Sequence, residues 1–197
     1  MSNTKTEILL DSFEKLKSKI NDSDYDYLYS INKIIRALLG TDKELSVNIW
    51  EYCLEEFKHY EDDYYYCNHM WAIIKVPFED YLRFCGIKNT INLLNTHPII
   101  KNTIYERYYS FSDNYIQSLI KNNLLFELDE YLLKLENNKL FMKNHNTDDG
   151  IGEAIEYITH MMDCKPSSEC IELLLSHAKL ANEEHQAQIN VNLIDYL

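Results

Sequence analysis

The amino-acid sequence predicts an all-α protein, and three observations support that fold class. Only 4 glycines and 3 prolines occur in 197 residues, although the tight turns of sheet proteins consume both residue types. Apolar residues recur at helical spacing along most of the chain, and polar residues that favour helix ends separate these stretches. We expect about ten helices in antiparallel hairpin succession, forming either a globular helical bundle or an irregular HEAT-like array.

The first three helices are predicted from apolar stripes bounded by capping residues. Thr4-Lys5-Thr6-Glu7 has the pattern of a capping box at the start of a helix. The second helix begins near Asp24 and ends at Gly40, which stands where a left-handed C-cap residue belongs. Thr41-Asp42-Lys43-Glu44 is a second capping box, and its helix runs to about His59. The short loops predict that these helices pack as antiparallel neighbours.

Prolines and glycines divide the middle of the chain. The helix over 64–75 is expected to stop before Pro77, because the residue before a proline avoids helical geometry. A short helix over 78–86 follows, and another over 89–95 is closed by Pro98. Further helices are expected at 99–111, 113–122, 124–135, 153–163 and 167–197, the last with a break near Ala181.

The length of the chain fits a single helical domain over residues 1–197. Such a chain buries roughly 70% of its extended surface on folding, so it needs no disulfide or metal for stability. The strongest loop signal covers residues 144–152 and contains two of the four glycines. A minor domain boundary is therefore placed there.

The net charge of −13 is unevenly distributed. Residues 1–80 carry 16 acidic and 9 basic side chains, and residues 146–197 carry 10 and 2. Residues 81–145 are mildly basic, with 6 acidic and 8 basic side chains. A chain this acidic repels nucleic-acid phosphates and anionic lipid and attracts basic proteins. We therefore expect a basic protein partner and no nucleic acid or membrane as ligand.

The cysteines and the N-terminus predict a cytoplasmic protein. Five cysteines, an odd number scattered through predicted helices, do not form a disulfide framework. The N-terminal residues are polar, without the apolar stretch of a signal peptide. The apolar runs are also too short to span a bilayer.

Two groups of residues are candidates for metal sites. Glu56 and His59 have the Glu-x-x-His spacing of di-iron bundles, but the second copy of the motif that such sites need is missing. A tetrahedral zinc site would need four ligands with spacings unlike those of established zinc motifs: His160, Cys164, Cys170 and His177. The sequence also lacks glycine-rich phosphate loops and nucleophile elbows. No cofactor, no metal and no enzymatic activity are therefore expected.

Tyrosines beside carboxylates are the unusual feature of this chain, which has 16 tyrosines against 7 phenylalanines. Consecutive tyrosines on a helix point in several directions, so they cannot all enter one core. Tyrosine is also an ordinary residue of the core boundary, but it is enriched at binding surfaces, where neighbouring acids would pair with a basic partner. The predicted partner-binding residues are Asp24, Tyr25, Asp26, Tyr27, Glu61, Asp62, Asp63, Tyr64 and Tyr65, and a third cluster covers 105–109.

An acidic, tyrosine-rich helical chain with the clusters at 22–29 and 61–66 resembles the immunity proteins of bacterial toxin systems, including contact-dependent inhibition and other polymorphic toxin systems. The frequent Asn, Ile, Lys and Tyr are typical of an AT-rich bacterial genome. The resemblance implies an inhibitor that binds a cognate toxin domain, often a basic nuclease, and occludes its active site. The alternatives are a helical adaptor or scaffold that binds a partner peptide, and a metal-dependent helical enzyme. The oligomeric state is left open.

Overall fold

In the computed structural model, residues 2–20, 25–56, 71–107, 113–136 and 150–196 are described, and every regular element in these ranges is a helix. The predicted all-α fold class is therefore confirmed. The chain divides into two compact units, 1–103 and 104–197. The division falls inside a helix, and the single domain with a minor boundary at 144–152 stays a prediction.

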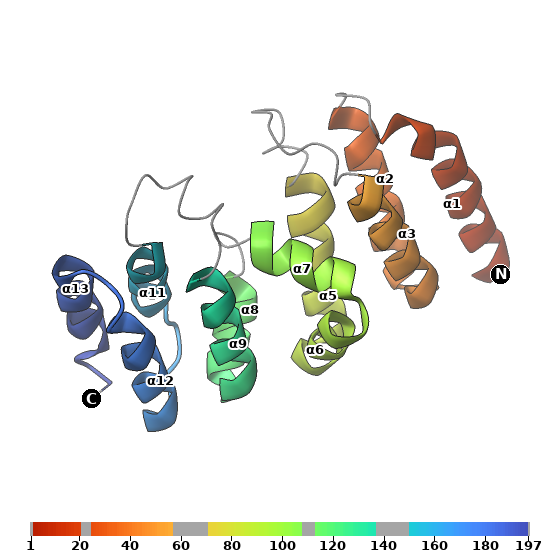
Figure 1. Ribbon diagram of the computed structural model, residues 1–197. Coiled ribbons are helices and arrows are strands. Elements are labelled where there is room, and N and C mark those ends of the chain that lie inside the picture. The colour runs from red at the N-terminus through yellow and green to blue at the C-terminus, as the bar shows by residue number, and fades with distance from the viewer. Residues whose placement is uncertain (1, 21–24, 57–70, 108–112, 137–149, 197) are drawn as a thin grey trace. The chain divides into compact units, whose positions relative to one another are not determined.

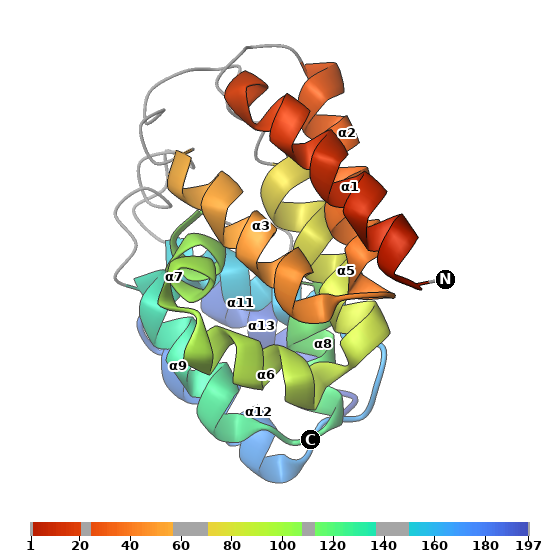
Figure 2. The same cartoon turned by 90° about the vertical axis from the view of Figure 1, so that its right-hand side faces the viewer.

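The N-terminal unit begins with helices that pack against their neighbours in sequence (Figures 1 and 2). Helix α1 covers Ser2–Leu16 and is extended by the 3₁₀ turn η1, Lys17–Lys19. Helix α2 (Tyr25–Leu39) contacts both α1 and α3 (Lys43–Glu56). Because α2 lies between these neighbours, its apolar side chains are among the most buried in the unit: Leu28, Ile31, Ile35 and Leu38.

The ends of these helices differ in detail from the predicted caps. Helix α1 already includes Thr4, so the first predicted capping box lies inside the helix. At the start of α3 the capping residue is Asp42 rather than Thr41, since Asp42 Oδ1 accepts from the Leu45 N–H at 3.0 Å. Helix α2 ends next to Gly40 as predicted, but Gly40 does not adopt the predicted left-handed conformation. Among the glycines in the described residues, Gly86 is the one with positive φ (77°). The Thr41 and Asp42 N–H groups instead close the α2 terminus on the carbonyl of Leu38.

Pro77 does not end a helix, contrary to the prediction. A π-helical turn, η3 (Trp71–Lys75), leads directly into α5 (Val76–Cys85), and Pro77 lies in the first turn of α5. In an α-helix the N–H of residue 77 would donate to the carbonyl of Ile73, and in a π-helix to that of Ala72. Proline has no N–H, so neither carbonyl receives a hydrogen bond from residue 77. Tertiary packing overrides the local preference, because residues 72–74 are buried.

Side chains from two other helices satisfy these carbonyls. Trp50 Nε1 on α3 donates to the Ile73 carbonyl oxygen at 2.7 Å, and Asn32 Nδ2 on α2 donates to that of Ala72. Both Trp50 and Asn32 are buried. A buried carbonyl without a donor costs about 1–3 kcal/mol, so these two hydrogen bonds make the proline-containing helix compatible with the core.

The N-terminal unit continues with α6 (Ile87–Thr96) and the first part of α7 (Pro98–Arg107). Pro98 is the first residue of α7, a position where the missing N–H costs nothing. His97 joins the two helices, and its Nδ1 lies 3.0 Å from Oε1 of Glu51 on α3. This contact ties the α6–α7 junction to α3.

The C-terminal unit contains helices α8 (Asp113–Lys121), α9 (Leu125–Glu136), α11 (Gly150–His160), α12 (Ser168–Ala178) and α13 (Glu183–Leu193). Helix α11 contacts α9, α12 and α13, and its Ile155 is fully buried. The predicted break near Ala181 is confirmed, since Asn182 caps α13 by accepting from the His185 N–H. None of the described helices combines the length and apolar character needed to cross a membrane.

Candidate protein-binding surface

The sequence-predicted binding residues lie mostly outside the described part of the chain. Asp24 and the cluster Glu61, Asp62, Asp63, Tyr64 and Tyr65 fall there, as does the side chain of Tyr25, the first residue of α2. Asp26 is exposed on the first turn of α2, and Tyr27 is half-buried with Lys19 Nζ 5.9 Å from its ring centroid. Of the predicted cluster at 24–27, the structure thus shows one exposed carboxylate beside one partly covered ring.

Tyrosines elsewhere divide between core and surface. Tyr105, from the third predicted cluster, is buried, and its hydroxyl lies 3.4 Å from that of Tyr115. The ring of Tyr131 meets both rings edge-on, with centroid distances of 5.4 Å to Tyr105 and 6.5 Å to Tyr115. Tyr105 is therefore a core residue and not part of a binding surface, because these rings fill the interior between α7, α8 and α9.

Helix α13 presents a surface that the sequence analysis missed. Its buried side carries Ile189 and Leu193, while Val191 and Ile194 at its C-terminal end are 60% and 67% exposed. Glu183, Glu184 and Ala187 are also exposed, and at 100° per residue they fall on the same side as Val191 and Ile194. We call these five residues the outward face of α13. The missed signal was a second apolar stripe, spaced i, i+4 and i+7 from Ala187.

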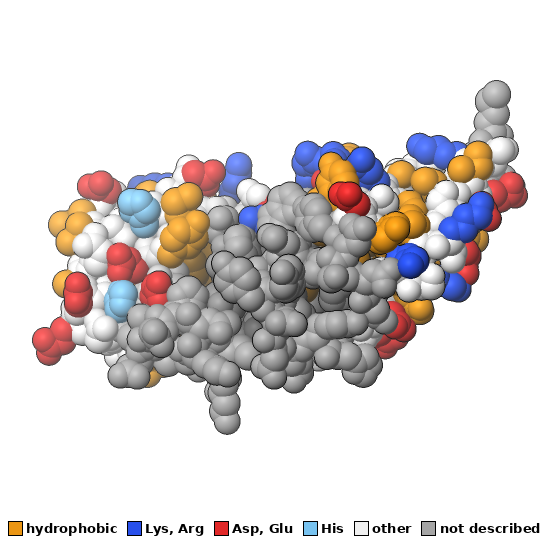
Figure 3. All heavy atoms as spheres, turned by 90° about the horizontal axis from the view of Figure 1, so that it is seen from above, with side chains coloured by type: hydrophobic (Ala, Val, Ile, Leu, Met, Phe, Trp, Pro, Cys, Tyr) orange, Lys and Arg blue, Asp and Glu red, His pale blue; other side chains and the backbone are white. Residues whose placement is uncertain are grey.

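The outward face of α13 also carries negative charge. Glu183 and Glu184 lie in the first turn of α13, where the helix dipole favours carboxylates. Neither forms an ion pair within the described residues. Leu180, in the turn before α13, is 64% exposed. Figure 3 shows acidic and hydrophobic side chains together at its left-hand end, over the C-terminal helices.

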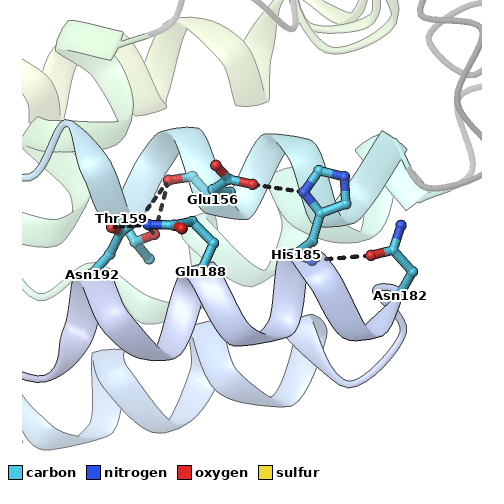
Figure 4. Close-up of polar contacts among 6 residues, drawn as sticks. All are labelled: Glu156, Thr159, Asn182, His185, Gln188 and Asn192. Carbon is cyan, nitrogen blue, oxygen red and sulfur yellow. Dashed lines mark hydrogen bonds and ion pairs between the residues drawn. The ribbon is translucent and has the colours of Figure 1, made fainter.

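A polar network holds α13 against α11 and so fixes its outward face (Figure 4). His185 Nδ1 lies 2.7 Å from Glu156 Oε2. Near the other end of the helix, Asn192 Nδ2 donates to Thr159 Oγ1 at 3.1 Å and to the Glu156 carbonyl oxygen at 3.3 Å. Two contact points along the helix prevent α13 from rotating about its own axis, which keeps Val191 and Ile194 turned toward solvent.

Helix α12 is fixed by similar contacts within the C-terminal unit. Buried His177 places Nε2 2.9 Å from Oδ1 of Asp129 on α9. Ser167 caps α12 by accepting from the Cys170 N–H, and its hydroxyl donates to Oδ1 of Asn123 at 2.7 Å. Asn123 adopts positive φ (53°) after α8, a conformation that asparagine tolerates better than most residues. These contacts join α12 to α9 and to the turn that follows α8.

The four candidate zinc ligands, all among the described residues, do not assemble into a metal site. No group of three or more His, Cys, Asp or Glu side chains within the described ranges is arranged to hold a metal ion. His177 is engaged with Asp129, and Cys170 is buried in α12. Glu56 is the last residue of α3, and His59 lies outside the described residues.

Three cysteines, Cys53, Cys164 and Cys170, lie in environments that disfavour the thiolate. Burial raises the pKa of the Cys53 thiol well above its ordinary value and that of Cys170 to about 11. Burial raises the pKa of Cys164 as well. Because the thiolate is the reactive form, these environments oppose nucleophilic and metal-binding chemistry.

We expect alkylation at pH 8 to follow burial. Iodoacetamide should modify the half-buried Cys85 and Cys164 first, while Cys53 and Cys170 should react about 100-fold more slowly, through opening of the fold. Peptide mass spectrometry over time gives the order, with urea-unfolded protein as the control in which these four cysteines react at similar rates. Native labelling of Cys53 as rapid as that of Cys85 would contradict the buried position of α3.

Comparison with known proteins adds no relative. The chain matches no protein-family model, no curated protein and no solved structure.

Proposed function

We propose that this chain is an acidic protein-binding inhibitor of the immunity type, which binds a basic toxin domain and occludes its active site. The observation that carries the proposal is the outward face of α13, where exposed Val191 and Ile194 adjoin Glu183 and Glu184, which have no ion-pair partner in the described residues. An apolar centre beside unpaired charge has the composition of a protein-binding surface. The net charge of −13 favours a basic partner.

The two kinds of residue on this face have separate roles in binding. The apolar side chains supply affinity, since burying a valine or isoleucine contributes about 1.5–3 kcal/mol. The glutamates raise the rate of association with a basic surface and make binding selective for basic partners. The contacts of His185 and Asn192 with α11 keep the face in one orientation before binding, which lowers the entropy cost of association.

The partner is identified by purifying the chain from its native host at mild salt and analysing co-purifying proteins by mass spectrometry. We expect one stoichiometric basic protein that is released at high salt. The same sample is tested for bound metal. A stoichiometric metal without a protein partner would contradict the inhibitor and support the metal-dependent enzyme.

With the partner in hand, Val191→Ser with Ile194→Ser should weaken binding about 100-fold, because two anchoring side chains are lost. Glu183→Gln with Glu184→Gln should reduce mainly the association rate and its dependence on salt. Surface plasmon resonance measures both, and Ile8→Ser, at an exposed isoleucine on α1, is the matched control. Binding that does not depend on salt concentration but requires Val191 and Ile194 would favour the adaptor function instead.

The predicted clusters at 24–27 and 61–65 stay proposals for a second contact with the same partner. Changing Asp62, Asp63 and Tyr64 together to Ala in the same assay tests one of them. Weakened binding would assign part of the interface to this cluster, and unchanged binding would leave α13 as the contact.

A further inference from the structure

The N-terminal unit carries a surface of the opposite charge, formed by α2 and α5. Arg36 on α2 and Arg83 on α5 both contact the carboxylate of Asp80, at 3.2 Å from Nε to Oδ2 and 2.7 Å from Nη2 to Oδ1. Asp80 is buried, with a side chain 8% exposed, whereas the arginine side chains are 51% and 60% exposed. One buried acid therefore holds two exposed guanidinium groups close together.

Further groups extend this surface along both helices. Lys33 lies one turn before Arg36 on α2 and is exposed, with its Nζ 4.4 Å from the centroid of the Tyr29 ring. Phe84 follows Arg83 and is 59% exposed, with the Arg83 guanidinium 4.9 Å from its ring centroid. Two cations thus contact one buried carboxylate, and a third lies one turn away on α2. Aromatic rings lie beside Lys33 and Arg83. We call these residues the arginine patch: Tyr29, Lys33, Arg36, Asp80, Arg83 and Phe84.

The arginines keep hydrogen-bonding capacity beyond the contact with Asp80. A guanidinium carries five N–H donors, and neither arginine has another carboxylate partner in the part of the chain that the structure describes. Asp80 removes one of the three positive charges and leaves a local excess of two. A contact that served only to join α2 to α5 would need one arginine, so the second arginine and the exposed phenylalanine remain to be explained.

We propose that the arginine patch binds a short acidic segment of a partner protein. Paired guanidinium groups match carboxylates in geometry and charge, and the exposed ring of Phe84 supplies apolar contact next to them. The net charge of −13 repels a long polyanion such as nucleic acid. Because salt screens charges beyond about 8 Å, a short segment interacts with the local patch and is little affected by the distant acids.

The experiment measures binding of a fluorescent peptide of glutamate and serine by fluorescence polarisation at low and physiological salt. We expect wild-type protein to bind it, and Arg36→Gln with Arg83→Gln to weaken binding at least about 10-fold. Lys88→Gln is the matched control, since Lys88 is an exposed cation on α6 that lies outside the patch. Circular dichroism shows whether each variant is folded.

A second pair of changes guards against loss of structure when the partners of Asp80 are removed. Lys33→Gln with Phe84→Ala leaves both ion pairs of Asp80 intact and should still weaken binding several-fold. No binding by the wild type, or equal weakening by Lys88→Gln, would overturn the proposal. So would stronger binding of an oligonucleotide than of the peptide, or self-association of the chain that the arginine changes abolish.

Discussion

Replacing Trp50 by phenylalanine should lower the free energy of unfolding by about 2–4 kcal/mol. The change removes the indole N–H that donates to the Ile73 carbonyl, an acceptor that Pro77 cannot serve, and leaves a small cavity at a position that is 1% exposed. Asn32→Leu, which removes the donor to the Ala72 carbonyl, should cost about 1–3 kcal/mol for the same reason. Urea denaturation followed by circular dichroism measures both values.

A double-mutant cycle separates the lost hydrogen bond from the lost volume. Pro77→Ala restores an N–H at residue 77, which can donate to the carbonyl that Trp50 no longer reaches. In the Trp50→Phe background this change should recover about 1 kcal/mol more than it does in the wild type. Tyr52→Phe, at an exposed position of α3, is the control and should change stability by less than about 0.5 kcal/mol. An identical effect of Pro77→Ala in both backgrounds would show that the carbonyls have no need of these donors.

Stability should also fall steeply above pH 10. Burial raises the pKa of Tyr115 to about 12. Burial and the neighbouring Tyr115 hydroxyl raise the pKa of Tyr105 even more. Both phenols stay neutral in the fold, while the unfolded chain loses these protons above about pH 10. Each of the two hydroxyls therefore lowers the free energy of unfolding by about 1.4 kcal/mol per pH unit above about pH 10, until the pH reaches its pKa in the folded protein. Together they remove about 5 kcal/mol between pH 10 and 12.

Urea denaturation at a series of pH values from 8 to 11 measures this slope. Tyr105→Phe with Tyr115→Phe should flatten it by about 2.7 kcal/mol per pH unit above pH 10. Tyr52→Phe, which removes an exposed phenol, should leave the slope unchanged. Other buried groups with raised pKa values, Cys53 and Tyr81, contribute equally in every variant. A slope that does not respond to the double change would contradict the buried tyrosine cluster.

Local signals in the sequence predicted the helices wherever the ends are set by neighbouring residues. Helix α8 begins at Asp113 and α9 ends at Glu136, each within one residue of the prediction, and the α12–α13 break lies at the predicted place. Asp42 rather than Thr41 caps α3. Either side chain can act as an N-cap, and which one does depends on the path of the backbone just before the helix. Boundaries of this kind follow from local capping chemistry.

The predictions that were wrong depend on contacts between residues far apart in sequence. The rule that helices stop before proline is a local preference, and it was overruled at Pro77 because distant Trp50 and Asn32 serve the freed carbonyls. The burial of Tyr105 likewise depends on Tyr115 and Tyr131, two residues on other helices. The candidate face on α13 was missed because its two apolar stripes look alike in sequence. Only packing against α11 distinguishes the buried stripe from the exposed one.

The bonds to the carbonyls of Ala72 and Ile73 also bear on how the N-terminal unit opens. They join residues 40 and 23 positions apart in sequence, so both bonds form only when α2, α3 and the helix that contains Pro77 are all in place. In arrays of independent helical repeats, by contrast, a terminal repeat can fray without exposing polar groups in its neighbours. Here, the loss of any one of the three helices leaves a buried carbonyl or its donor without a partner, and the three should therefore exchange their amide hydrogens as a single cooperative unit.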